Sequence, residues 1–411
     1  MKHLYLLLLP ILLLGACSRE PKDCRKIERI YTPYFKTRAE VRSAMNSSSP
    51  RPIERPGKLY SYGSWIFLSD KEQGIHVIDN QNPGAPVQRA YLPIPGNIDI
   101  AVKGHHLYAD SWADLVVFDL SDMNNIRPVK FLSDVFPHRA SYWINGSSST
   151  DSTPVVAGYT VRDTMVECIS QTRGGIGWGS VLTNAASSSG GGAAGSMSRF
   201  ALTSGRLYTV DGNALQSYTL NDPANPQPSP PTWLNASAET LYPFGSSLFI
   251  GTTTGMYIYD ISTPSQPTYL SHFEHARLCD PVITDGTHAF VTLRSGGFCA
   301  GNQNQLDVLR VTNLLQPVPV RTYELTNPHG LAKDGDLLFV CDGDDGLKVY
   351  NCQDPANLVL LEKISVPGTF DVIAQYGQLY LVSSAGLYQY NYNTGLPYRS
   401  LQLKSILSVR P

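Results

Sequence analysis

Acidic and imidazole side chains recur at one register of this chain. Each stands about ten positions before the aromatic residue of a short apolar run, and the members are Asp99, Glu239, Asp280, His329 and Asp371, with Arg199 at the same register in one further run. Four carboxylates that met at one place would repel one another unless a cation or a basic side chain lay among them. The pattern therefore predicts a site for an oxygen-liganded divalent metal such as Ca²⁺, or for a cationic ligand.

The same five residues also admit a purely structural interpretation. Short polar side chains at strand ends commonly bond to neighbouring backbone groups and so tie elements together. Two of the five stand in turn-like sequences, Asp280-Pro281 and Pro328-His329-Gly330. Both interpretations stay open at the level of the sequence.

A possible anion contact lies in the Gly-rich stretch LRSGGFCAGNQN, residues 293–304. Arg294 offers a planar fork of donors that matches a carboxylate or a phosphate, and the glycines leave backbone N–H groups accessible. The alternative is an internal ion pair between Arg294 and a carboxylate such as Asp280. The sequence contains no nucleophile elbow, HExxH, P-loop or dinucleotide fingerprint, which favours a non-catalytic role.

The candidate residues belong to a unit that is repeated along the chain. In residues 245–267, GSSLFIGTTTGMYIYDISTPSQP, two β-rich runs are joined by a polar turn that ends in Gly and are followed by a turn with two prolines. The first run of each unit carries an aromatic residue: Phe67, Tyr108, Tyr208, Phe249, Phe290, Phe339 and Tyr380. Most neighbours lie about 40 residues apart, as in four-stranded propeller blades, so we expect the units to stack around an axis.

The units predict an all-β fold over residues 57–411, a β-propeller of seven four-stranded blades. The gap between Tyr108 and Tyr208 exceeds two periods and holds a hairpin-like segment at 155–168 and a Gly/Ser-rich stretch around 169–197, flexible by composition. An insertion in the third blade accounts for it best, because no turn with paired prolines follows Cys168. The alternative is a degenerate extra blade and a total of eight.

The N-terminal residues 1–16 are expected to form a lipoprotein signal peptide. A basic start and an apolar run precede Leu14-Gly15-Ala16-Cys17, which resembles the bacterial lipobox. Cys17 would then carry acyl chains such as palmitate and tether the protein to a membrane, and Ser18 after it suggests the outer membrane. Residues 17–56 form a leader with one strand at 26–35 and a short helix at 38–45; whether the protein faces the periplasm or the exterior stays open.

Six further cysteines remain after Cys17, an even number that is compatible with disulfides in an oxidising compartment. Cys279 and Cys299 are a possible pair, because together they would staple the long loop of the fifth unit. The formal net charge of −2 gives no argument for nucleic acid.

Two repeats, GIHVIDNQNPGAP at 74–86 and GLKVYNCQDPANL at 346–358, resemble the LVIVD-repeat family of bacterial extracytoplasmic proteins. With its lipobox, the chain is similar to the LVIVD-repeat lipoproteins of Bacteroidetes-type bacteria. The resemblance implies a β-propeller at the cell envelope and no agreed activity. We therefore expect a membrane-anchored, non-catalytic module that binds a protein or a glycan. The alternative is a metal-dependent hydrolase or lyase at the central channel, with the five candidate residues as ligands and base.

Overall fold

The computed structural model describes residues 25–138, 150–167, 192–274, 281–295 and 303–410. The chain divides into two compact units, Met1–Pro33 with Tyr159–Ile176, and Tyr34–Gly158 with Gly177–Pro411. The described part of the smaller unit belongs to a two-stranded ribbon, in which β1 (Arg25–Thr37) pairs with β10 (Pro154–Glu167). Among the described residues, no helix is both long and apolar enough to cross a bilayer.

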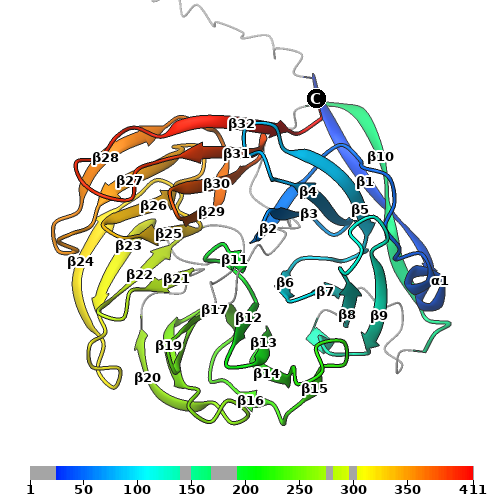
Figure 1. The fold of residues 1–411 in the computed structure, drawn as a ribbon, viewed down its shortest axis with the longest axis horizontal. Coiled ribbons are helices and arrows are strands. Elements are labelled where there is room, and N and C mark those ends of the chain that lie inside the picture. The colour runs from blue at the N-terminus through cyan, green and yellow to red at the C-terminus, as the bar shows by residue number, and fades with distance from the viewer. Residues whose placement is uncertain (1–24, 139–149, 168–191, 275–280, 296–302, 411) are drawn as a thin grey trace, which may run out of the picture. The chain divides into compact units, whose positions relative to one another are not determined.

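The larger unit is a seven-bladed β-propeller (Figure 1). Blade 1 contains β2 (Pro56–Tyr62), β3 (Trp65–Asp70), β4 (Gly74–Asp79) and β5 (Val87–Pro93). Blade 2 contains β6 (Ile100–Lys103), β7 (His106–Ser111), β8 (Asp114–Asp119) and β9 (Arg127–Leu132). Blade 3 contains β12 (Phe200–Thr203), β13 (Arg206–Asp211) and β14 (Ala214–Thr219), with β15 (Gln227–Pro228) and β16 (Thr232–Trp233) both paired to β14.

Four further blades complete the ring. Blade 4 contains β17 (Ala238–Phe244), β18 (Ser247–Thr252), β19 (Gly255–Asp260) and β20 (Thr268–Glu274). Blade 5 contains β21 (Val282–Thr284), β22 (His288–Leu293), β23 (Gln305–Arg310) and β24 (Val318–Glu324). Blade 6 contains β25 (Leu331–Asp334), β26 (Leu337–Cys341), β27 (Leu347–Asn351) and β28 (Val359–Ile364). Blade 7 contains β29 (Thr369–Gln375), β30 (Gln378–Ser383), β31 (Gly386–Asn391) and β32 (Gln402–Ser408). Neighbouring strands within each of the seven blades pair antiparallel.

The prediction of seven four-stranded blades is confirmed, and the alternative of eight is wrong. The segment that could have been an extra blade forms the single long strand β10, which pairs with the leader strand β1 instead of starting a sheet of its own. A short strand from the Gly/Ser-rich stretch, β11 (Gly192–Ala194), joins blade 1 at its inner edge by pairing with β2.

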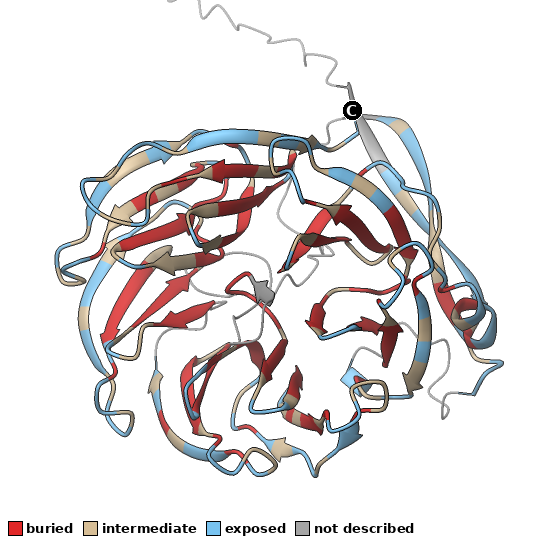
Figure 2. Cartoon of the chain, in the orientation of Figure 1, coloured by how far each residue is buried: buried red, intermediate tan, exposed pale blue. Residues whose placement is uncertain are grey.

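Burial explains the composition of the strands (Figure 2). The second strand of each blade lies in a sheet that packs between two neighbouring sheets, and almost all its residues are buried, as in β26, where every residue is buried. The outermost strands cover one face only, and in β24 most residues are exposed. Apolar clusters fill the spaces between blades and hold the ring together.

Two repeated features of the unit have local physical causes. In blades 1, 4, 6 and 7 a glycine stands at the start of the third strand because the outer strand passes close by: a Cβ at Gly346 would lie 2.1 Å from the Ile364 carbonyl oxygen. In blades 1, 2, 4 and 6 the third strand ends in an Asp or Asn whose side chain accepts the N–H two residues on, as in Asp260 with Ser262 at 2.9 Å. This Asx turn starts the loop with the prolines.

Blades 7 and 1 close the ring through side chains and a short bridge. Both blades are built from consecutive strands, apart from the added β11, so the first and last blades share no sheet in the described chain. Ile53 lies in an apolar cluster that includes Leu59 and Ile66 of blade 1 and Phe370 and Val382 of blade 7. Its backbone forms a parallel bridge to Val409, and Arg410 N donates to its carbonyl oxygen at 2.9 Å.

Candidate functional site

The centre of the propeller is occupied by the chain itself. β11 lies near the middle of the ring (Figure 1), and residues 195–198, which follow it, are buried. Gly195 accepts from Lys58 Nζ of blade 1 at 3.4 Å, Ser196 Oγ accepts from Leu331 N of blade 6 at 2.7 Å, and Ser198 Oγ donates to Asp99 of blade 2 at 2.8 Å. We call residues 192–198 the central segment; it ties three blades together across the axis.

Asp99 is fully buried and holds the end of the central segment against blade 2. Besides the Ser198 hydroxyl, its carboxylate accepts from the backbone N–H groups of Ile100 at 2.7 Å, Arg199 at 2.5 Å and Phe200 at 3.1 Å. Burial raises its pKa, against the opposing effects of Lys58 and these hydrogen bonds. Its oxygens are therefore already used in positioning the chain that enters blade 3.

Asp371 shares the same buried centre with Lys58. Asp371 accepts from Val372 N at 3.1 Å, and Lys58 Nζ lies 4.0 Å from Asp99 Oδ1. Burial raises the pKa of Asp371 to about 7, and burial lowers the pKa of Lys58 although both carboxylates act to raise it. A Cβ at Gly195 would lie 1.9 Å from Asp371 Oδ1, so only glycine fits there.

The basic group that the sequence argument required among the carboxylates is Lys58. With an ammonium beside Asp99 and four hydrogen bonds on that carboxylate, the donor set favours the structural interpretation of Asp99 and Asp371 over coordination of a divalent cation. Within the described ranges, no group of three or more His, Cys, Asp or Glu side chains is placed to hold a metal ion.

Glu239 and His329 lie elsewhere on the ring. Glu239, in β17 of blade 4, is buried and interacts electrostatically with Arg199 and Arg294. His329 precedes β25 of blade 6; its side chain is buried, and its Nδ1 has no hydrogen-bond partner among the described residues. Burial, together with the nearby charges of Arg294 and Lys71, lowers the pKa of His329 to about 3.

The register thus does not produce one acidic site. Asp99 and Asp371 meet at Lys58, Glu239 faces two arginines, and His329 lies near Arg294 and Lys71. Asp280, Cys17, Cys279 and Cys299 lie outside the described residues, so the proposed pairing of Arg294 with Asp280, the lipid attachment and the disulfide stay predictions. Cys341 and Cys352, by contrast, are described and are free, buried thiols.

Sequence reasoning missed Lys58 and Lys71. The register count could have found Lys58, because it stands before Phe67 as Asp99 stands before Tyr108 and Asp371 before Tyr380. Lys71 belongs to the turn between β3 and β4, where its neighbours Asp70 and Glu72 conceal it among ordinary turn charges. No sequence signal pairs this turn with blade 6.

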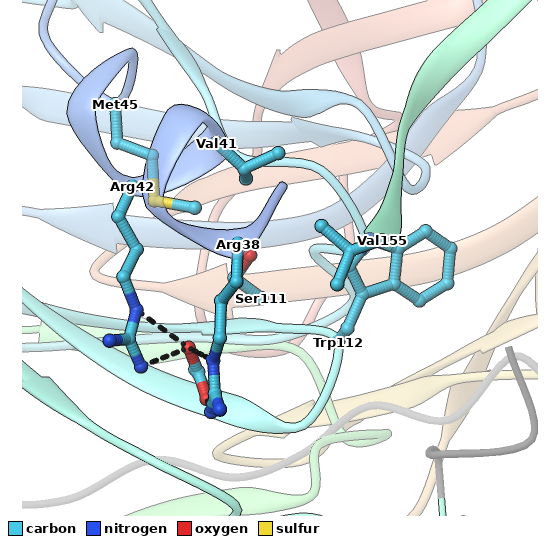
Figure 3. A pocket seen from close by; sticks show the side chains of 8 residues that line it. Arg38, Val41, Arg42, Met45, Ser111, Trp112 and Val155 are labelled. Carbon is cyan, nitrogen blue, oxygen red and sulfur yellow. Dashed lines mark hydrogen bonds and ion pairs between the residues drawn. The ribbon is translucent and has the colours of Figure 1, made fainter. Parts of the chain in front are cut away.

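A small hollow lies between blade 2 and α1 (Arg38–Ser43) of the leader (Figure 3). Arg38 and Arg42 both donate to the buried carboxylate of Asp114, with Arg42 Nη2 at 2.8 Å from Oδ2 and Arg38 Nε at 3.1 Å from it. These side chains, with Val41 and Met45, fill the hollow so far that it leaves room for about one water molecule. The bonds from the two arginines to Asp114 fasten α1 to blade 2, and the remaining space is too small for a ligand larger than water.

Comparison with known proteins agrees with the fold. The LVIVD repeat matches residues 97–126, in blade 2, and 245–274, in blade 4. A search of curated proteins finds no match. Among solved structures, the computationally designed Ika8 protein aligns with TM-score 0.52 and 9% identity over 88% of this chain and 91% of its own.

Two natural proteins align equally distantly. The periplasmic gluconolactonase PpgL of Pseudomonas aeruginosa has a TM-score of 0.52 and 10% identity over 86% of this chain and 98% of its own. A chain of the mitotic checkpoint complex has a TM-score of 0.50 and 10% identity over 86% and 92%. At such identities the likeness extends to the propeller fold alone.

Proposed function

We propose that this protein is a non-catalytic binding module of the cell envelope, whose propeller presents a rigid surface to a protein or a glycan. The observation that carries the proposal is the buried central segment, which occupies the axis where propeller sites usually lie. With the axis taken up by Ser196, Ser198 and Lys58, the channel is used for structure, and binding falls to the mouth and the loops around it. The distant likeness to a gluconolactonase does not transfer an activity.

A titration with divalent metals tests this proposal against the metal-dependent hydrolase or lyase. We expect Ca²⁺, Mg²⁺, Mn²⁺ and Zn²⁺ to bind the purified chain no more tightly than they bind an Asp280→Ala, Asp371→Ala variant, measured by calorimetry after dialysis against chelator. The reason is that Lys58 Nζ lies 4.0 Å from Asp99 Oδ1 and also interacts electrostatically with Asp371, so the two buried carboxylates already share a counter-charge. A metal that binds one-to-one to the wild type and is lost in the variant would overturn the non-catalytic proposal.

The second part of the proposal is the anchor. We propose that Cys17 carries palmitate-type acyl chains and holds the protein at the outer membrane, as the resemblance to LVIVD-repeat lipoproteins of Bacteroidetes-type bacteria implies. In a Gram-negative host, the wild-type chain should incorporate a labelled palmitate analogue and sediment with membranes, whereas Cys17→Ser should do neither. Equal labelling of both chains would contradict the anchor without touching the metal result.

A further inference from the structure

Contacts between four neighbouring blades bring three nitrogen-bearing side chains to one arc of the ring, where Arg294 and Lys71 both act electrostatically on His329. Thr292 Oγ1 at the end of β22 in blade 5 donates to the His329 carbonyl of blade 6 at 2.6 Å. The next residue of blade 6, Gly330, donates through its N–H to the Phe370 carbonyl of blade 7 at 3.0 Å. Lys71 Nζ of blade 1 lies 4.3 Å from the centre of the Phe370 ring. Arg294, two residues after Thr292, completes the arc.

The carboxylates near this arc already have partners. Asp70 accepts from Arg55 N at 2.7 Å and lies 3.5 Å from His76, and Glu72 lies 3.5 Å from Arg55. Among the described residues, Glu239 is the acidic group that acts on Arg294, and it also acts on Arg199. Within that part of the chain, Arg294 therefore has only a share of one carboxylate; Asp280, which the sequence also offers it, lies outside the described residues.

Burial lowers the pKa of each of the three groups. Burial lowers the pKa of Lys71 to about 8, with Arg55 adding to the effect and Asp70 and Glu72 opposing it. Burial lowers the pKa of Arg294, which Glu239 only partly offsets. His329 is only 8% exposed, and its Nδ1 has no hydrogen-bond partner among the described residues. A buried polar atom without a hydrogen bond is costly and often marks a place where a ligand supplies it.

We propose that Arg294, Lys71 and His329 form a binding site for an oxyanion of the carboxylate or phosphate class, carried by the partner or by a free ligand. This inference rests on the proposed binding function and names the chemistry that its site selects. The Arg294 guanidinium can bind two oxygens side by side, the Lys71 ammonium adds a point charge, and the His329 imidazole can donate one N–H. Arg294 and Lys71 are both partly exposed, so an anion reaches them from solvent.

Calorimetric titration of the full chain with inorganic phosphate and, separately, with acetate tests the site. We expect Arg294→Met and Lys71→Met each to weaken binding of the preferred anion by about tenfold or more, since each removes a charge-assisted hydrogen bond. Arg89→Met is the matched control. It removes the same charge from an exposed arginine paired with Asp79 at 2.8 Å, and should leave the affinity within about twofold.

A second variant and an NMR measurement make the result decisive. Arg294→Lys keeps the charge and should retain part of the affinity, which separates loss of the site from loss of folding. In wild-type protein, the bound anion should raise the pKa of His329, followed by NMR of its imidazole. The inference is overturned if neither anion binds, if Arg89→Met weakens binding as much as Arg294→Met, or if His329 does not respond. None of these outcomes bears on the metal titration, so the two proposals fail separately.

Discussion

Aspartates at the end of the second strand supply part of the acidity near the centre of the ring. At the end of the second strand, Asp110 accepts from Ile98 N at 2.8 Å and Asp99 N at 2.9 Å, and Asp342 accepts from Asn327 N at 2.7 Å. Each carboxylate thus binds the backbone that enters its own blade. Buried acceptors of this kind satisfy N–H groups that no strand partner reaches, so an acidic channel rim needs no metal to account for it.

The buried carboxyl of Asp371 makes the stability of the folded protein depend on pH. Its pKa of about 7 in the folded protein lies above the ordinary value of about 4, so only the folded state holds the proton between these limits. The contribution to the free energy of unfolding is present below pH 4 and is lost as the pH rises through 7. We expect wild-type protein to lose about 2–3 kcal/mol relative to Asp371→Asn between about pH 5 and pH 8.

Urea denaturation of both proteins at several pH values measures this difference. Asp79→Asn serves as the control, because Arg89 and the Gln81 N–H lower the pKa of that carboxyl, which therefore stays ionised between pH 5 and pH 8. Parallel stability curves for wild type and Asp371→Asn would show that Asp371 is already ionised across this range, with Lys58 as its counter-charge.

The sequence predicted the residues of the centre better than their grouping. Counting back from the aromatic residues identified Asp99 and Asp371, which do meet, because equivalent positions of a closed ring converge on its axis. It could not show that Lys58 lies between them or that Glu239 faces Arg199 and Arg294. Those groupings depend on how far each side chain lies along the axis, and the repeat does not encode that depth.

At the level of elements, the central segment departs most from expectation. Its composition, GGGAAGS at residues 190–196, indicates a flexible linker, yet residues 192–194 form β11 and residues 195–198 are buried. Small side chains are what the centre requires, because a Cβ at Gly195 would clash with Asp371. Composition alone cannot separate a linker from a strand that must fit a narrow space.

In the leader, by contrast, the elements were predicted correctly but their contacts were not. Strand β1 and helix α1 fall where the sequence places them, since α1 starts with a capping box in which Thr37 and Glu40 satisfy each other's backbone N–H groups. What could not be foreseen is the partner of α1. Asp114 is the first residue of β8 in blade 2, and nothing in the repeat marks it, yet it receives both Arg38 and Arg42.

For the whole molecule, the repeat determined the architecture. Seven aromatic residues at a period of about 40 were sufficient to give seven blades, because a unit of this size buries both faces only between two neighbours. The closure of the ring could not be predicted in this way. The backbone bridge at the junction of blades 7 and 1 is made by residues 53 and 409–410, which lie outside the repeated strands and carry no repeat signal.

Ile53 lies at the junction of blades 1 and 7, so its substitution tests how much ring closure contributes to the stability of the propeller. Its side chain is 1% exposed within the cluster that joins blades 1 and 7, so Ile53→Ala should lower the free energy of unfolding by about 2–5 kcal/mol. Ile406→Ala is the control: that side chain is 43% exposed on the outer strand β32, and its loss should cost less than about 1 kcal/mol.

Urea unfolding followed by tryptophan fluorescence measures both variants. If the seven blades unfold as one unit, the slope against urea stays the same in Ile53→Ala while the midpoint falls. An effect no larger than that of Ile406→Ala would mean that other contacts between blades 7 and 1 hold the ring closed, such as the hydrogen bond from Gln389 Nε2 to Asn80 Oδ1 at 2.8 Å.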